Sequence, residues 1–314
     1  MAEGAVRIVE VAPRDGLQSY HEHVPTERKL ALIERLVAAG LTDIEATSFA
    51  HPKVVPHLAD GADVMRALPR VPGVRYRALV PNLTGAVHAI DAGVDLVMAF
   101  VSASATYSED NQNMTIDYAL EQLEAISAVT REAGIGWAAG ISMAFGSPYE
   151  DESRPNDVLR LVERCAALRP DHLYLADTVG GAAPAWVEAL CTAVRVRWPE
   201  LPLAVHLHGA GTRGLACAVA AVHAGAVQVE TSICGLGGPV IRAPGTPLVG
   251  NLATEAVVAT FADLGIDTGL VPGEVRSAAR DVAGLLGLPR HRDRPPLDAA
   301  YVAALAGLTE PTLS

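Results

Sequence analysis

Short apolar runs rich in β-forming residues alternate with longer stretches of helical periodicity along most of the 314 residues. Eight such runs occur, in the order VRIVEV, DIEATSF, VRYRALV, DLVMAFV, GWAAGIS, HLYLAD, LAVHLH and AVQVETS. Strands that alternate with helices form parallel sheets, and eight strand-helix units close naturally into a (β/α)8 TIM barrel. A doubly wound open sheet is the alternative, but no GxGxxG motif opens the first unit. We therefore predict a TIM barrel.

The helical stretches carry their own boundary signals. In TERKLALIERLVAAG, Thr26 is the expected N-cap and Gly40 the expected stop. The eighth helix falls in NLATEAVVATFADLG, and further helical pattern follows it, interrupted by the proline-rich HRDRPPLD. We expect a catalytic barrel domain over residues 1–265 and a C-terminal helical extension over residues 266–314, which packs on the barrel or covers its mouth.

Composition excludes several classes of protein. No apolar run approaches the roughly 20 residues needed to cross a bilayer. A net charge of -12 disfavours a nucleic-acid partner, since such proteins normally present a basic face. The four cysteines form no CxxC pair, and the first residues lack the pattern of a secretory signal. We expect a cytoplasmic protein without a disulfide framework, a membrane span or a nucleic-acid ligand.

Polar residues gather where the predicted strands end. In a TIM barrel the catalytic groups lie at the carboxyl ends of the strands and in the loops that follow. The residues at those places are Arg14, Asp15, Glu45, Asp177, His206, His208 and Asn251. Each alone is explained as a strand cap or a loop hydrogen bond, but the fold brings them to one rim.

Four of these residues suit a divalent cation. Asp15, His206, His208 and Asn251 offer two oxygens and two imidazole nitrogens, and they leave coordination positions open for substrate oxygens. A structural zinc site would be closed and usually built from thiolates. Hard oxygen donors favour Mg²⁺ or Mn²⁺, while the histidines keep Zn²⁺ or Co²⁺ possible.

The motifs also resemble a known family. The segments VEVAPRDGLQ, IEATSFAHPKVVPHLAD, GSPYED, LADTVG, AVHLH and GLGGP…GNLATE, between about Arg7 and Gly265, are similar to 3-hydroxy-3-methylglutaryl-CoA lyases. These are metal-dependent TIM barrels of the lyase and synthase group. The resemblance implies that Asp15, His206, His208 and Asn251 bind the metal and that the substrate is an acyl-CoA or a 3-hydroxy acid.

The same resemblance implies roles for other residues. Arg14 would stabilise the enolate or carbonyl, and Glu45 and Asp177 would assist in the site. Proton transfer is open to Asp15, His206 or Glu45. The expected substrate-binding residues are Gln18, Ser142, Gly237 and Gly238.

The chain departs from the family pattern at two places. Pro239 stands where these lyases carry a catalytic cysteine directly after GLGG, thought to protonate the product enolate. Cys234 lies five residues earlier, and we expect it to be a buried thiol rather than that acid. Gly209 replaces the aspartate of the family's HDT, which leaves the identity of the hydroxyacyl-CoA open.

Three functions are compatible with these observations. The first is a metal-dependent carbon-carbon lyase that cleaves 3-hydroxy-3-methylglutaryl-CoA or a related 3-hydroxyacyl-CoA to acetyl-CoA and an oxo acid. The second is a synthase that condenses an acyl-CoA with a 2-oxo acid, suggested by the missing cysteine. The third is a catalytically silent ligand-binding barrel. A homodimer is expected only because barrels of this size often associate, and the His21–His23 segment is expected to be a surface loop.

Overall fold

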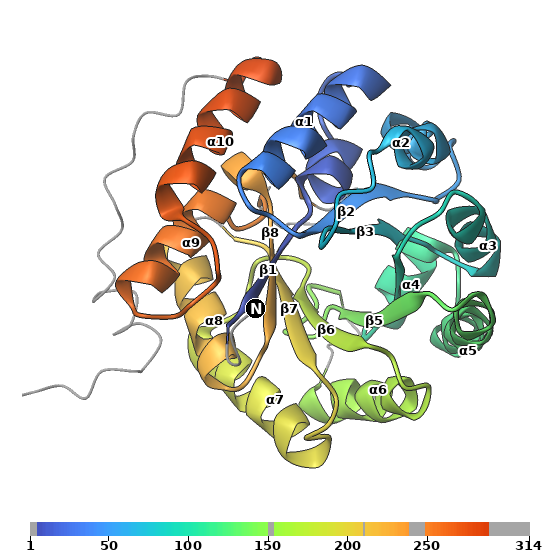
Figure 1. The fold of residues 1–314 in the computed structure, drawn as a ribbon. Coiled ribbons are helices and arrows are strands. Elements are labelled where there is room, and N and C mark those ends of the chain that lie inside the picture. The colour runs from blue at the N-terminus through green and yellow to red at the C-terminus, as the bar shows by residue number, and fades with distance from the viewer. Residues whose placement is uncertain (1–4, 150–153, 210, 239–248, 289–314) are drawn as a thin grey trace, which may run out of the picture.

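The computed structural model describes residues 5–149, 154–209, 211–238 and 249–288. Eight parallel strands in this part of the chain form a closed barrel in which β1 pairs with both β2 and β8 (Figure 1). The strands are β1 (Arg7–Glu10), β2 (Asp43–Ser48), β3 (Arg75–Leu79), β4 (Leu96–Ser102), β5 (Gly136–Ser142), β6 (His172–Asp177), β7 (Leu203–Leu207) and β8 (Gln228–Thr231). The predicted TIM barrel is confirmed, and each strand lies within its predicted run or differs from it by one residue at an end.

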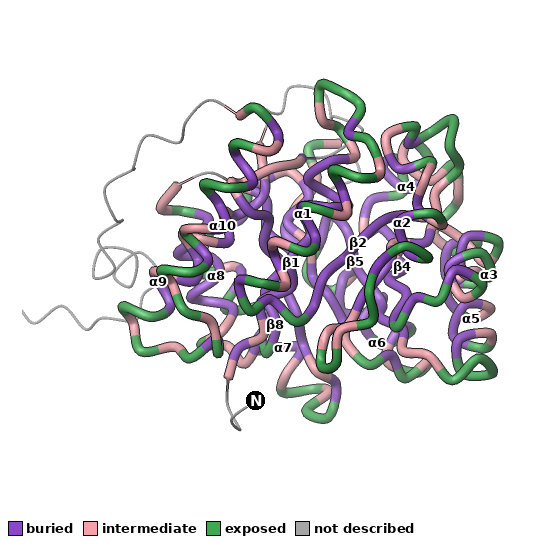
Figure 2. The backbone as a smooth tube through the Cα atoms, turned by 45° about the horizontal axis from the view of Figure 1, so that its top comes forward, coloured by how far each residue is buried: buried purple, intermediate pink, exposed green. Residues whose placement is uncertain are grey.

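Helices surround the barrel and connect successive strands. They are α1 (Thr26–Ala38), α2 (Gly61–Ala67), α3 (Leu83–Asp91), α4 (Ala105–Gln112), α5 (Ile116–Ala133), α6 (Pro155–Ala167), α7 (Pro184–Arg197), α8 (Thr212–His223), α9 (Thr254–Asp263) and α10 (Pro272–Leu285). Three short turns of helix accompany them: η1 (Ala12–Gly16), η2 (Pro56–Leu58) and η3 (Ile233–Gly235). Most strand residues are buried, whereas buried and exposed positions alternate along the surrounding helices (Figure 2). This pattern is expected when the hydrophobic core lies between a parallel sheet and the helices that cover it.

The start of α1 differs from the prediction. Pro25 is the N-cap, and no side chain caps the helix. Thr26 instead donates its hydroxyl to Asp60, at 2.6 Å, just before α2. The expectation of a Thr26 N-cap was wrong because a tertiary partner captured its side chain. Gly40 does follow the helix end, with a φ of +93° that favours glycine.

A polar layer crosses the barrel interior below the carboxyl ends of the strands. Buried Arg77 forms an ion pair with Asp43 and donates to Gln228 Oε1 at 3.1 Å. Tyr174 donates to the same oxygen at 2.7 Å. These groups satisfy one another, so we interpret the layer as structural.

Helix α10, the last helix in the described residues, packs against α1 and α9. Val275 and Val282 of this helix and Leu286 just after it belong to the main hydrophobic core. An ion pair joins Arg35 of α1 to Asp281 of α10. The remainder of the predicted extension, including HRDRPPLD, lies outside the described residues. None of the described helices is both long and apolar enough to span a membrane.

Candidate metal and active site

His206 of β7 and His208, the first residue after β7, lie on the same side of the chain because the alternation of the strand continues through them. Their Nε2 atoms lie 3.1 Å apart. Nδ1 of His208 donates to the Thr178 carbonyl at 2.7 Å, and Nδ1 of His206 lies 2.8 Å from Glu230 Oε2. Because Nδ1 of each ring faces a fixed acceptor, the Nε2 lone pairs of the neutral rings point at one another. Such an arrangement is stabilised by a cation between them.

Asp15 completes a three-residue cluster. One ligand atom from each of Asp15, His206 and His208 lies within 4.8 Å of the others, and Asp15 Oδ2 is 3.7 Å from His208 Nε2. Burial raises the pKa of this carboxyl, but the Arg14 guanidinium and the two histidines outweigh burial and hold it well below its usual range. Asp15 is therefore an ionised oxygen donor at neutral pH.

Asn251 supplies the fourth expected group. Its Nδ2 donates to Asp15 Oδ2 at 2.6 Å and to the Leu236 carbonyl at 2.8 Å. Its Oδ1 is buried and accepts no hydrogen bond from any residue in the described part of the chain. A buried acceptor without a partner is costly unless a ligand satisfies it. These four side chains therefore fit a divalent cation with mixed oxygen and nitrogen donors.

Arg14 lies directly beside this cluster of expected metal ligands. It follows β1 within η1, and its Nε donates to Glu45 Oε2 at 2.6 Å while its Nη1 pairs with Asp15. Burial raises the pKa of Glu45 to about 7, an increase that Arg14 opposes. Glu45 Oε1 accepts no hydrogen bond from the described residues. A register shift in the pairing of β2 with β3 between Glu45 and Thr47 marks a bulge, a feature common next to active sites.

The substrate-binding residues expected from the sequence lie around the cluster. Gln18 donates to Asp15 Oδ1 at 2.8 Å and approaches the Gly238 carbonyl at 3.4 Å. Gly237 has a φ of +106°, and a Cβ atom there would lie 2.5 Å from Asn251 Nδ2 and 2.7 Å from Asp15 Oδ2. Any larger residue at position 237 would therefore collide with the Asn251 and Asp15 side chains. Ser142 ends β5 and lines the cavity described next.

A cavity of about 280 Å³ opens at the carboxyl ends of the strands. Its lining includes Arg14, Asp15, Gln18, Ser142, His206 and His208. Asp177, expected among the catalytic residues, does not line it. Its two carboxylate oxygens instead accept the backbone N–H groups of Gly181 and Ala182 at 3.0 and 2.9 Å. Asp177 thus fixes the loop after β6 that carries Thr178, the acceptor for His208.

Sequence reasoning missed Glu230 and Tyr107, which also line the cavity. Glu230 lies on β8 and is the register neighbour of His206 on β7. The alternation of Gln228 and Glu230 along AVQVETS was the available signal, since both side chains point into a barrel.

Other sequence expectations have clear outcomes. Cys234 is only partly buried, in contrast to the expectation of a buried thiol; it donates its thiol to the Ala279 carbonyl of α10 at 3.3 Å and does not line the cavity. His21, Glu22 and His23 are exposed, so the predicted surface loop is confirmed. Gly209 has a φ of +141°. Pro239 lies outside the described residues.

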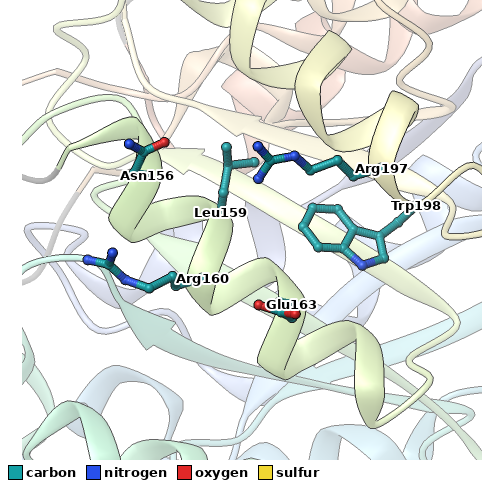
Figure 3. Close-up of a pocket in the computed structure, with 6 residues that line it drawn as sticks. All are labelled: Asn156, Leu159, Arg160, Glu163, Arg197 and Trp198. Carbon is teal, nitrogen blue, oxygen red and sulfur yellow. The ribbon is translucent and has the colours of Figure 1, made fainter.

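A second hollow lies on the flank of the barrel, between α6 and the end of α7 (Figure 3). It is lined by Asn156, Leu159, Arg160, Glu163, Arg197 and Trp198. Helix α7 ends at the amino-terminal side of the barrel, away from the carboxyl ends where catalytic groups of this fold lie. This hollow is therefore separate from the candidate site.

Closed parallel strands with histidine, carboxylate, amide and guanidinium groups at their carboxyl ends define a TIM barrel of the metal-dependent class. The HMGL-like family model matches residues 5–282. Mitochondrial hydroxymethylglutaryl-CoA lyase of Rattus norvegicus is 38% identical over 266 residues, covering 84% of this chain and 81% of that protein. This chain belongs to the HMGL-like family.

Two further comparisons agree. Hydroxymethylglutaryl-CoA lyase YngG of Bacillus subtilis is 37% identical over 284 residues, 90% of this chain and 94% of that protein. The structure of an HMG-CoA lyase from Acinetobacter baumannii, in complex with coenzyme A and 3-methylmalate, is similar with a TM-score of 0.84 and 31% identity. That likeness covers 95% of this chain and 99% of the other.

Proposed function

We propose that this chain is a divalent-metal-dependent carbon-carbon lyase that cleaves 3-hydroxy-3-methylglutaryl-CoA, or a closely related 3-hydroxyacyl-CoA, to acetyl-CoA and an oxo acid. The observation that carries the proposal is the convergence of the His206 and His208 Nε2 atoms with Asp15 beside the Arg14 guanidinium. The curated relatives named as lyases support cleavage over condensation and over a silent binding barrel.

Asp15, His206, His208 and Asn251 would hold the metal. When bound, a divalent cation supplies Lewis-acid chemistry, which acidifies the substrate hydroxyl and orients a neighbouring oxygen. Two of the four donors are oxygens, so we favour Mg²⁺ or Mn²⁺ over Zn²⁺ or Co²⁺.

The other residues act on charge and protons. Arg14, held by Glu45 and Asp15, would place its guanidinium at the thioester oxygen, where negative charge develops as the bond breaks. Of the three candidates for proton transfer, Glu45 has a pKa of about 7, raised by burial, and it can gain and lose a proton near neutral pH. Gln18, Ser142, Gly237 and Gly238 would contact the substrate, while Asp177 would position the loop behind His208.

The first experiment is cleavage of 3-hydroxy-3-methylglutaryl-CoA by the purified full chain with Mg²⁺ or Mn²⁺, followed by mass spectrometry. We expect acetyl-CoA and acetoacetate with metal, and neither product from a metal-stripped sample. Metal binding without turnover of this or any related 3-hydroxyacyl-CoA would overturn the proposed activity. We also propose a cytoplasmic location and a homodimer, which fractionation and light scattering would test.

The variant His208→Ala tests the metal site directly. Removing one imidazole ligand should weaken Mn²⁺ binding by more than about 100-fold and abolish turnover. Mn²⁺ electron paramagnetic resonance measures the binding, and His88→Ala, which removes an exposed histidine of α3, is the matched control. Unchanged Mn²⁺ affinity in H208A would contradict the assigned ligands.

A further inference from the structure

Cleavage of a 3-hydroxyacyl-CoA leaves an enolate that needs a proton, and the thiol that related lyases place after GLGG is absent here, because Pro239 occupies that position. Cys234 does not replace it, since its thiol is directed to the Ala279 carbonyl of α10. We propose that Tyr107 is the acid that protonates the enolate. This inference rests on the proposed lyase function.

Tyr107 is placed at the cavity by the loop after β4. Ser104 caps α4 by accepting the Tyr107 N–H at 3.1 Å, and its own N–H donates to Ser102 Oγ at 3.0 Å. All three residues are buried. These two hydrogen bonds therefore fix the first turn of α4. The centroid of the Tyr107 ring lies 6.3 Å from that of the Tyr149 ring.

The phenol shares the cavity with the reacting groups. Tyr107 lines the cavity together with Arg14, Asp15 and Ser142. Only 5% of Tyr107 is exposed, and its hydroxyl makes no hydrogen bond to another described residue. A hydroxyl that lines a cavity and bonds to none of the described residues is available to a ligand in that cavity.

Electrostatics keep this hydroxyl protonated. Burial and the nearby Asp15 carboxylate raise the pKa of Tyr107 well above its usual range. The phenol thus carries a proton at neutral pH and is a stronger acid than the serine and threonine hydroxyls of the same cavity. The other cavity phenol, Tyr174, donates to Gln228 in the polar layer.

The step balances as follows. The substrate hydroxyl loses its proton to a base, the bond between the carbinol carbon and the α-carbon breaks, and its electron pair passes to the α-carbon and thioester oxygen. The Tyr107 O–H bond then breaks as a C–H bond forms at the α-carbon, which gives the methyl group of acetyl-CoA. The phenolate recovers a proton from solvent, and the base releases the one it took.

The variant Tyr107→Phe removes the proton and keeps the ring. The direct assay is exchange of the acetyl-CoA methyl hydrogens in D2O with Mg²⁺, followed by NMR, because the reverse of protonation is proton abstraction by the Tyr107 phenolate. The assay is run at alkaline pH, where more of this phenolate is present. We expect Y107F to reduce both this exchange and kcat for cleavage by about 10²–10³-fold, with KM and Mn²⁺ affinity unchanged. Tyr118→Phe, which removes an exposed phenol of α5, should change neither.

The outcomes separate this inference from the proposed function. Wild-type cleavage with exchange and kcat preserved in Y107F overturns the role of Tyr107 and leaves the lyase intact. Wild-type exchange that Y107F loses, without cleavage of 3-hydroxy-3-methylglutaryl-CoA, supports Tyr107 and rejects that substrate. A parallel loss of Mn²⁺ affinity in Y107F, or an absence of exchange in the wild type, also overturns the inference.

Discussion

Glu230 shows how a single residue can orient the metal site without reaching the metal itself. Its carboxylate lies 2.8 Å from His206 Nδ1 and is almost fully buried. A carboxylate in this position fixes the ring and increases the basicity of the opposite nitrogen. His206 is correspondingly affected: burial lowers its pKa, but Glu230 and Asp15 outweigh burial and raise it.

We expect Glu230→Gln to weaken Mn²⁺ binding by about 10-fold and Glu230→Ala by up to about 100-fold, because the neutral amide still accepts the ring N–H whereas alanine does not. Isothermal titration measures both variants. Glu200→Gln, which neutralises an exposed carboxylate, is the control. Equal affinity in the wild type and E230A would show that Glu230 does not support His206.

The sequence could identify the residues at strand ends but not the partners that orient them. Asp15, His206 and His208 could be identified because they lie after β1 and at the end of β7, and the fold brings such positions to one rim. Glu230 becomes a partner of His206 only through the register of β7 with β8. Tyr107 depends on the exact path of the loop after β4, which no periodicity encodes.

At the scale of elements, Glu10 ties three segments to the end of β1. Its Oε1 accepts the N–H groups of Ala12 at 2.8 Å and Ile233 at 2.9 Å, and its Oε2 lies 2.7 Å from the Thr254 hydroxyl. These contacts join η1, η3 and α9. Because η1 carries Arg14 and Asp15, the contacts of Glu10 fix the position of the segment that supplies two of the candidate site residues.

Burial raises the pKa of Glu10 from 4.5 to about 7, although its hydrogen bonds oppose the increase. The folded protein therefore binds this proton more tightly than the unfolded chain, and the stabilising effect is lost as the pH rises from about 4.5 to about 7. Glu10→Gln imitates the protonated acid. We expect E10Q to exceed the wild type by about 3 kcal/mol in free energy of unfolding at pH 8, with little difference at pH 4.5.

Urea unfolding at the two pH values measures this difference. Glu124→Gln, an exposed position of α5, controls for the change in net charge. A constant offset between E10Q and the wild type across pH 4.5–8 would show that Glu10 has no raised pKa.

Helices and strands could be predicted where the signal lies within the segment itself. They could not be predicted where a side chain bonds to a residue far away in the sequence. The runs GWAAGIS and HLYLAD coincide with β5 and β6 because each is a short, mostly apolar run of strand length, a signal that belongs to the segment itself. Thr26 was misassigned because its partner, Asp60, lies 34 positions away. Short α4, with its serine cap, has almost no amphipathic pattern and could be found only by its cap residue.

At the scale of the whole molecule, α10 and the barrel share one core rather than forming two. Val282 is fully buried within the core cluster that also contains Leu32 and Phe261. Tyr20, in the loop after β1, donates to the Leu286 carbonyl at 2.8 Å. We therefore propose that the predicted boundary near residue 265 separates segments of sequence but not units of folding.

The variant Val282→Ala tests this proposal, because it removes two buried methyl groups and should lower the free energy of unfolding by about 2 kcal/mol. If α10 belongs to the cooperative unit, the main thermal transition of the whole chain should shift down by about 3 °C. Arg280→Ala, exposed on the same helix, should stay within about 0.5 kcal/mol of the wild type. An unshifted main transition in V282A, with a separate early transition for the helix, would show instead that α10 folds independently of the barrel.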